Sequence, residues 1–225
     1  MSGPAGFAEW RAQYRADLGP SPVERAPQPS DPEWKPFLQG WRREGLEPRF
    51  QPAWARLRWN ERGLLFDIVL TGAGPRNAAR QLNERTWELG DIAEIFVQQE
   101  GSDEYLEIHV TPENQRLQLR WTVAGFAAFR RDQTLFSRYT VGDPSWVESA
   151  SVVRDRDWSV SAFLPAAILA LGPAGLGPAA RLRGTVCRYD CTAGEVIHSA
   201  TARLTEASYH RRADWDSIAL VGAPA

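Results

Sequence analysis

Two glutamates, a histidine and an arginine recur at strand spacing in TWELGDIAEIFVQQEGSDEYLEIHVTPENQRLQLRW, residues 86–121. Glu94, Glu107, His109 and Arg120 each alternate with apolar neighbours, which places all four on one polar face of a predicted sheet. Such a face has three interpretations. It is a solvated surface of mixed charge, a polar groove that hydrogen-bonds a ligand, or a carboxylate pair for glycoside hydrolysis.

The order of these side chains depends on the pairing of the three predicted strands. One face of each strand is wholly apolar and is expected to form the core, with Leu117, Leu119 and Trp121 on the core side of the third strand. Two-residue turns at 100–101 and 113–114 set the register. The predicted cross-strand pairs are Glu94 with Glu107, Ile92 with His109, Phe96 with Tyr105, Glu107 with Arg120 and His109 with Gln118.

The predicted Glu94–Glu107 pair argues against catalysis. Like charges directly opposite each other cost up to about 1 kcal/mol on a solvated face, and Arg120 is the group that offsets this cost. An arginine beside both carboxylates would keep both ionised, whereas a general acid needs a raised pKa. A non-catalytic site is therefore expected.

The elements that position this face are strands along most of the chain. Residues 53–70 predict a hairpin, "WSVSAFLP" from Trp158 predicts a strand, and residues 181–190 and 196–204 predict a strand pair. The segment 166–171, between a proline and a glycine, predicts a single short helix. Many short strands with little helix indicate an all-β, antiparallel, jelly-roll-like β-sandwich over residues 34–225.

The N-terminal region, residues 1–33, has a different pattern. Phe7, Trp10, Tyr14 and Leu18 recur at helical spacing, and a segment rich in proline and serine follows them. These residues predict a short amphipathic helix and an extended strap. The aromatic stripe packs on the chain's own domain, or it forms a contact with a protein partner or a second copy of the chain.

Composition excludes several classes of function. A net charge of −2 argues against a nucleic-acid partner, and the long uncharged run 162–180 is interrupted by proline and glycine, so no membrane span is expected. The start shows no signal-peptide pattern, which favours a cytoplasmic location. Cys187 and Cys191 would lie roughly 13 Å apart on an extended strand, too far for a disulfide, and only a tight turn between them would allow one.

The order and spacing of several motifs give the chain a resemblance to a known family. "AWARLRWNERGLLFDIVLTG", "WELGDIAEIFVQ" with "YLEIHVTP", and the later "DWSVSAFLPAAIL", "RLRGTVCRYD" and "ASYHRRADWDSIALV" follow one another over residues 34–222. In these motifs the chain resembles family 9 carbohydrate-binding modules and the related DOMON-type sandwich domains.

The resemblance implies a β-sandwich that holds a sugar on its polar sheet face between aromatic rings. Trp87 matches the first aromatic clamp and Glu94 the first hydroxyl acceptor. Glu107 and His109 occupy strand positions where sugar binders carry an arginine and an asparagine. Tyr189 lies near the position of the second clamp, and Trp146 and Trp158 are the tryptophans that could approach this position from elsewhere. The ligand-binding residues that we predict are Trp87, Glu94, Tyr105, Glu107, His109, Arg120 and Tyr189.

Two functions follow as expectations. The first is non-catalytic binding of a saccharide; the alternative is a stand-alone intracellular interaction domain that has lost sugar binding and uses the N-terminal helix as its contact. Open access to Trp87 and the Glu94–Glu107 face would favour the first, and a face filled by the chain itself the second. The resemblance also implies structural calcium as a possible cofactor, with no ligands assigned, and no haem is expected.

Overall fold

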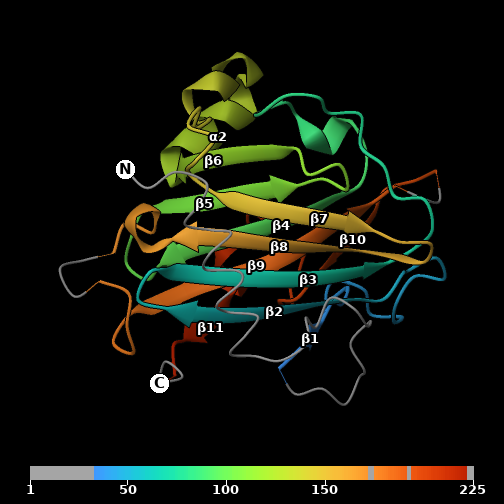
Figure 1. The fold of residues 1–225 in the computed structure, drawn as a ribbon, viewed down its shortest axis with the longest axis horizontal. Coiled ribbons are helices and arrows are strands. Elements are labelled where there is room, and N and C mark those ends of the chain that lie inside the picture. The colour runs from blue at the N-terminus through green and yellow to red at the C-terminus, as the bar shows by residue number, and fades with distance from the viewer. Residues whose placement is uncertain (1–32, 172–174, 192–193, 222–225) are drawn as a thin grey trace.

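Alternating apolar residues build two antiparallel sheets that pack face to face (Figure 1). This computed structural model describes residues 33–171, 175–191 and 194–221. The first sheet has the order β1-β2-β3-β8-β7, and the second has the order β10-β9-β4-β5-β6, with β11 also paired to β9. The predicted all-β antiparallel sandwich is confirmed. The predicted helix and strap of residues 1–33 lie almost wholly outside the described residues.

The strands of the first sheet are β1 (Lys35–Pro36), β2 (Ala53–Asn60), β3 (Gly63–Thr71), β7 (Glu148–Val153) and β8 (Asp157–Pro165). Those of the second sheet are β4 (Ile92–Gln99), β5 (Glu104–Val110), β6 (Arg116–Thr122), β9 (Arg181–Asp190), β10 (Ile197–Ala200) and β11 (Asp216–Ala219). The helical segments are η2 (Thr86–Glu88), α2 (Val123–Arg131), η3 (Gln133–Arg138), η4 (Ala166–Ile168) and η5 (Arg212–Asp214).

The main core lies between the two sheets. Alternate residues of each strand point into it, among them Ile68 of β3, Ile95 of β4 and Ile108 of β5, all fully buried. The predicted core faces of the first two strands in residues 86–121 are therefore confirmed. Removal of this apolar area from water is the main term that stabilises the sandwich.

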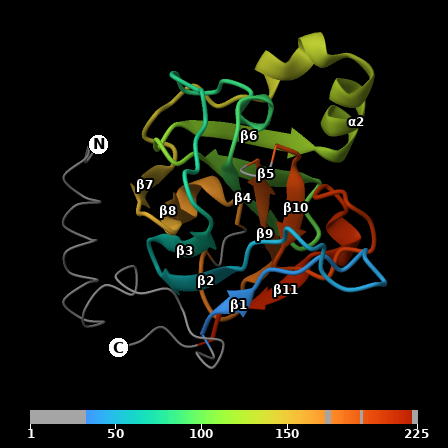
Figure 2. The same cartoon turned by 90° about the vertical axis from the view of Figure 1, so that its right-hand side faces the viewer.

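A second apolar cluster covers the outer face of the second sheet. It joins aromatic side chains of the sheet, such as Trp121, to Phe129 of α2 and to Tyr209 and Trp215 near the C-terminus. Figure 2 shows α2 beyond the edge of the sheet at β6. Helix α2 begins where the Thr122 side chain accepts a hydrogen bond from the Gly125 backbone N–H. The outer face is thus partly buried, and it is not an ordinary solvated surface.

The predicted β4–β5 register is wrong by two residues. Glu94 lies opposite His109, and Phe96 lies opposite Glu107. Residues 100–103, with Gly101 at φ 82°, connect the strands in place of the predicted two-residue turn. A slip of two keeps every side chain on its predicted face.

The predicted β5–β6 register is wrong by one residue, and this moves Arg120 to the other face. Glu107 lies opposite Leu119, and Arg120 lies opposite Leu106. Thr111 and Gln115 close the turn around three residues, with Asn114 at φ 61°, so the pairing shifts by an odd number.

The two faces of β6 are exchanged relative to the prediction because β6 is an edge strand and both of its faces are covered by other parts of the chain. Its apolar residues Leu117, Leu119 and Trp121 meet the aromatic cluster under α2. Its polar residues reach around the rim of the sandwich, where Arg120 donates to the Ile168 carbonyl oxygen and Gln118 to the Val141 carbonyl oxygen. An alternating edge strand is compatible with either orientation when both faces are covered.

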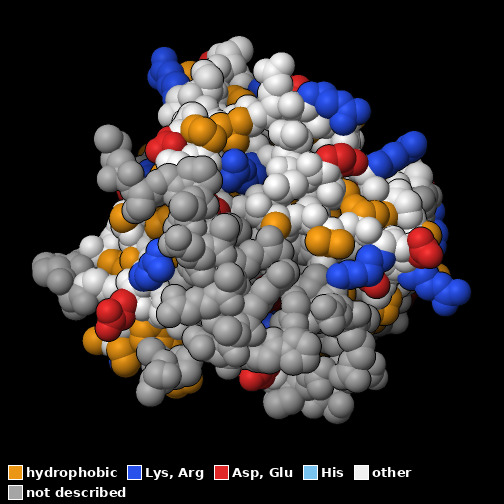
Figure 3. Space-filling model, viewed as in Figure 1, with side chains coloured by type: hydrophobic (Ala, Val, Ile, Leu, Met, Phe, Trp, Pro, Cys, Tyr) orange, Lys and Arg blue, Asp and Glu red, His pale blue; other side chains and the backbone are white. Residues whose placement is uncertain are grey.

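Two further differences concern helices and cysteines. The helix predicted over 166–171 is the short 3₁₀ segment η4, whereas α2 and η3 follow β6 in a stretch for which no helix was predicted. Cys187 and Cys191 are free, as expected, with Cys187 inside β9. On the face seen in Figure 3, acidic and basic side chains of the described residues are interspersed. No helix among these residues is long and apolar enough to cross a lipid bilayer.

Candidate functional site

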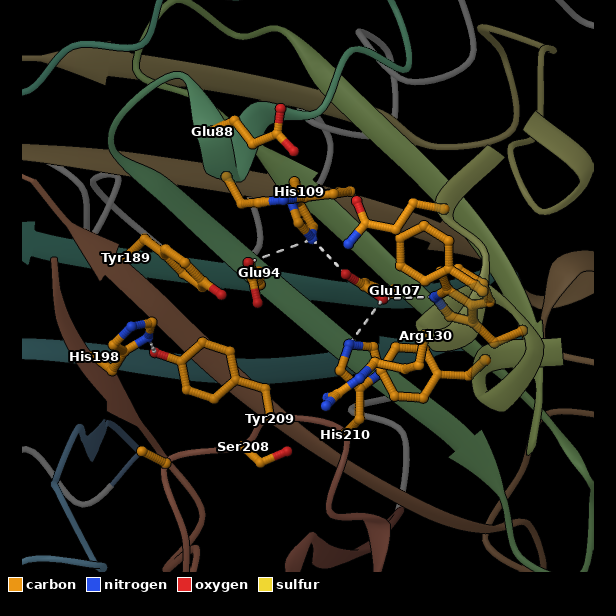
Figure 4. A pocket seen from close by; sticks show the side chains of 16 residues that line it. Glu88, Glu94, Glu107, His109, Arg130, Tyr189, His198, Ser208, Tyr209 and His210 are labelled. Atoms are coloured by element: carbon orange, nitrogen blue, oxygen red, sulfur yellow. Dashed lines mark hydrogen bonds and ion pairs between the residues drawn. The ribbon is translucent and has the colours of Figure 1, made fainter. Parts of the chain in front are cut away.

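A pocket of about 550 Å³ opens on the outer face of the second sheet. Strands β4, β5 and β9 form its floor, and η2, α2 and residues 207–210 line its sides (Figure 4). Its lining residues are Trp87, Glu88, Glu94, Glu107, His109, Trp121, Phe126, Phe129, Arg130, Gln133, Tyr189, His198, Ala207, Ser208, Tyr209 and His210.

Three polar side chains meet at the centre of the floor. Glu94 of β4 and its cross-strand partner His109 of β5 are 2% and 1% exposed, and Glu107, two residues before His109, is 5% exposed. His109 Nε2 lies 2.8 Å from Glu107 Oε1 and 3.4 Å from Glu94 Oε1. Both carboxylates therefore face one imidazole nitrogen (Figure 4).

Neighbouring groups fix two members of this triad. Thr86 Oγ1 lies 2.8 Å from His109 Nδ1, and Asn77 Nδ2 donates to the Thr86 carbonyl oxygen at 2.8 Å, which anchors η2. Trp121 Nε1 donates to Glu107 Oε2 at 2.6 Å. The imidazole and the Glu107 carboxylate thus have defined orientations before any ligand arrives.

Glu94 differs from the other two. Its polar contact among the described residues is the 3.4 Å approach of His109 Nε2, and it accepts no hydrogen bond from any of them. A buried carboxylate without donors is costly in a folded protein, because the solvation it had in water is not replaced. Glu94 therefore presents acceptor oxygens to whatever enters the pocket.

The second histidine of the pocket, His210, approaches Glu107 from the side. Its Nε2 lies 3.6 Å from Glu107 Oε2, and its Nδ1 lies 2.9 Å from the Tyr105 hydroxyl. The ring stacks on Phe126 with a centroid distance of 3.6 Å and an interplanar angle of 18°. His210 links the floor of the pocket to the wall formed by α2.

Burial and charge set the protonation of the floor. Burial, opposed by His109 and reinforced by Glu107, raises the pKa of Glu94 to about 8. Burial also acts to raise the pKa of Glu107, but His210, His109 and the Trp121 indole together hold it below its ordinary value. Burial lowers the pKa of His210 to about 4, so His210 is neutral at pH 7. At that pH, His109 and the Trp121 indole are the groups that hold the pKa of Glu107 down.

The pKa of the His109 imidazole is shifted in the opposite direction from that of His210. Burial acts to lower its pKa, but the two glutamates outweigh burial and the pKa is raised above the ordinary value. At neutral pH the floor therefore holds a protonated Glu94 beside an ionised Glu107. Its polar groups offer both hydrogen-bond donors and acceptors to a ligand.

Aromatic rings form the upper part of the pocket. Trp87, half-buried in η2, lies edge-on to His109 at 5.8 Å and to Phe136 at 5.6 Å. Tyr189, which also lines the pocket, meets His198 edge-on at 4.4 Å. Aromatic rings beside a polar floor can hold a ligand that has both apolar faces and polar edges.

Five of the seven predicted binding residues lie together around this pocket: Trp87, Glu94, Glu107, His109 and Tyr189. Tyr105, 2% exposed, does not line the pocket and contacts it through His210. Arg120 does not belong to the site. Its guanidinium pairs with Glu104 at 3.0 Å on the other side of the sheet, because of the one-residue change in register.

The candidate second tryptophan clamps lie elsewhere. Trp158 is fully buried in the core between the sheets, and Trp146 lies under the Arg120 guanidinium, 5.4 Å from the ring centroid. The sequence also did not predict Phe126, Arg130 and Gln133 as lining residues. Helix α2 and η3 carry them, and the strand alternation of β6 gave no sign of these elements.

Three other lining residues were also missed as a group: His198, Tyr209 and His210. The tyrosine hydroxyl lies 3.2 Å from His198 Nδ1. One signal in the sequence was available, since the chain has three histidines and all three line this pocket. Their separation along the chain, at 109, 198 and 210, concealed this relation.

The calcium that the resemblance implied does not fit the floor. Glu94, Glu107 and His109 form the group of three or more potential ligands found among the described residues, with one donor atom from each within 4.8 Å of the others. Calcium takes six to eight oxygen ligands, whereas this group contributes an imidazole nitrogen and has two carboxylates. A calcium ion therefore has no assigned place in the described part of the chain.

Comparisons with known proteins give a likeness of structure. No protein-family model and no curated protein matches the sequence. A protein from Bacteroides uniformis, proposed to bind carbohydrate, superposes with a TM-score of 0.65 at 17% identity, over 83% of this chain and 85% of that one.

Two structures of a family 9 carbohydrate-binding module from Caldicellulosiruptor kristjanssonii are also similar. The complex with cellotriose has a TM-score of 0.56 at 13% identity, covering 85% of this chain and 84% of that chain. The complex with glucose has a TM-score of 0.55 at 13% identity, covering 79% and 81%. The chain thus has a fold like that of family 9 carbohydrate-binding modules, which confirms the predicted fold resemblance.

Proposed function

We propose that this chain, which has a fold like that of family 9 carbohydrate-binding modules, binds a saccharide without catalysis in the pocket above β4 and β5. The observation that carries this proposal is the buried Glu94 carboxyl group at the floor of an open pocket. It accepts no hydrogen bond from the described residues. A sugar hydroxyl that donates to Glu94 would satisfy it.

The rest of the pocket supports the same class of ligand. Trp87 and Tyr189 offer apolar ring surface above a polar floor, and sugar rings present C–H faces and hydroxyl edges. A volume of about 550 Å³ lies within the range of small-molecule sites. The C. kristjanssonii modules were solved with glucose and cellotriose, so gluco-configured sugars are the first to test.

The competing hypothesis of an interaction domain without a ligand required the polar face to be filled by the chain's own side chains or covered by the strap of residues 1–33. Among the described residues an open pocket lies there. The N-terminal helix proposed as the protein contact lies outside the described residues. Binding of a small ligand is therefore the function that the described residues favour.

The experiment is a thermal-shift screen of the full chain against glucose, xylose, mannose and galactose and their oligosaccharides. One sugar class should raise the melting temperature in a concentration-dependent way, because ligand binds the native state. Trp87→Ala should abolish the shift, and Trp146→Ala, at a half-buried tryptophan outside the pocket, should retain it. No shift with any sugar would contradict the proposal.

Glycoside hydrolysis is a second candidate that one observation favours. The environments of Glu94 and Glu107 push their pKa values apart, which is the pattern of an acid–base pair, and Arg120 is not beside them. Against it, His109 Nε2 lies between the two carboxyl groups and contacts both. We expect no release of reducing sugar from any glycoside that binds. Turnover lost in Glu107→Gln would establish the enzyme instead.

A further inference from the structure

The three histidines of the chain converge on one pocket, and two of them direct Nε2 toward the same carboxylate. His109 Nε2 lies 2.8 Å from Glu107 Oε1, and His210 Nε2 lies 3.6 Å from Glu107 Oε2. Sugar recognition requires hydroxyl partners, and it does not require imidazoles and carboxylates in mutual contact. The arrangement therefore suggests that the floor of the pocket can also bind a ligand other than a sugar.

Glu94, Glu107 and His109 offer one donor atom each within 4.8 Å of the others, and all three residues are at most 5% exposed. A zinc-type ion with bonds of about 2.1 Å needs tetrahedral ligand atoms about 3.4 Å apart. The His109–Glu94 separation is 3.4 Å, and the His109–Glu107 separation is 2.8 Å. Small side-chain movements would therefore admit the ion.

Outer contacts hold two of these ligands in the required direction. Thr86 Oγ1 lies 2.8 Å from His109 Nδ1, which leaves Nε2 facing the carboxylates. Trp121 Nε1 donates to Glu107 Oε2 at 2.6 Å, so the other carboxylate oxygen, Oε1, faces His109. Hydrogen bonds to the far side of ligating histidines and carboxylates are typical of protein metal sites.

Glu94, the third proposed ligand, is buried without a hydrogen-bond donor among the described residues. Glu94 is 2% exposed, and the groups around it in the described residues donate no hydrogen bond to it. A divalent cation at the floor would displace the proton of Glu94 and pair with its carboxylate, and a ligand hydroxyl would give Glu94 a hydrogen-bond partner instead. Figure 4 shows its carboxyl group directed into the pocket beside His109.

We propose that Glu94, Glu107 and His109 bind a divalent transition-metal ion of the zinc class at the floor of the pocket. His210 approaches the other oxygen of Glu107, Oε2, at 3.6 Å and is not one of the proposed ligands. Its Tyr105 partner can donate to or accept from Nδ1, so either tautomer of His210 is supported. Nitrogen and few oxygens select zinc and its neighbours over calcium and magnesium.

This inference goes beyond sugar binding and does not depend on it. Three protein ligands with an open pocket above leave a position for water or a ligand oxygen. The test uses zinc alone, without any saccharide, so failure of one proposal does not imply failure of the other.

The experiment is a calorimetric titration of the full chain, freed of any affinity tag and treated with chelator, with Zn²⁺ and separately with Ca²⁺. Zinc should bind one ion per chain and raise the melting temperature, and calcium should do neither. Glu94→Gln and His109→Gln should each weaken zinc binding at least about 100-fold. His198→Gln, at the pocket histidine outside the triad, should keep the wild-type affinity.

X-ray absorption of the zinc-loaded protein provides a readout that misfolding cannot imitate. It should show nitrogen and oxygen ligands at about 2.0–2.1 Å with an imidazole contribution. Zinc binding that survives in both Glu94→Gln and His109→Gln would overturn the proposal. So would stabilisation by calcium without stabilisation by zinc, or no binding of zinc to the folded wild-type chain.

Discussion

The hydrogen bond from Trp121 to Glu107 makes Trp121→Phe a direct test of the pocket floor. Trp121 is 1% exposed, and its Nε1 donates to Glu107 Oε2 at 2.6 Å. Phenylalanine removes this donor and leaves a buried carboxylate with one partner fewer. A hydrogen bond to a buried charged group contributes about 1.5–3 kcal/mol. The free energy of unfolding should fall by that amount beyond the loss of side-chain volume.

Trp158→Phe is a matched control for the volume term. Trp158 is also fully buried, and its Nε1 has no hydrogen-bond partner among the described residues. Urea unfolding of both variants, monitored by circular dichroism, should show the larger loss for Trp121→Phe. In a Glu107→Gln background the difference should shrink to about 1 kcal/mol, the value for a neutral hydrogen bond. Equal costs of the two substitutions, within about 0.5 kcal/mol, would refute the assigned bond.

Three further predictions concern the same region. In chelator, stability should fall as pH rises from about 4.5 to 8, because the pKa of Glu94 is about 8 in the folded state and 4.5 otherwise. Urea titrations of Glu94→Gln should lack this fall, which is on the order of 3 kcal/mol at pH 7. Thr86→Val should weaken zinc binding about 10–100-fold in calorimetry at unchanged fold, since it removes the 2.8 Å contact to His109 Nδ1. Gly125→Ala should lower stability by about 1–3 kcal/mol in urea unfolding, because the new Cβ would lie 2.7 Å from Tyr139 Cε1.

The sequence was sufficient for the sandwich and for most of the pocket floor. Period-two alternation fixes which residues of β4 and β5 share a face, so Glu94, Glu107 and His109 were placed together despite a wrong register. A slip of two residues along a strand changes neighbours and preserves faces. The resemblance added Trp87, which alternation could not place because it lies in a 3₁₀ segment.

The sequence failed at β6 and beyond for a physical reason. Both faces of this edge strand are covered, one by α2 and one by the rim of the sandwich, so alternation does not reveal which face is which. A turn of three residues in place of two then moved Arg120 away from the site. His198 and His210 reach the pocket through tertiary packing over long separations, which no local pattern records.

Calorimetric titration of the full chain with each saccharide of the thermal-shift panel, glucose and cellotriose first, tests the central claim most directly. The account predicts saturable binding at one site per chain by at least one saccharide of the screened panel, lost in Trp87→Ala and weakened in Glu94→Gln. Absence of heat and of stabilisation with every saccharide of the panel, for a chain that unfolds cooperatively, would contradict it.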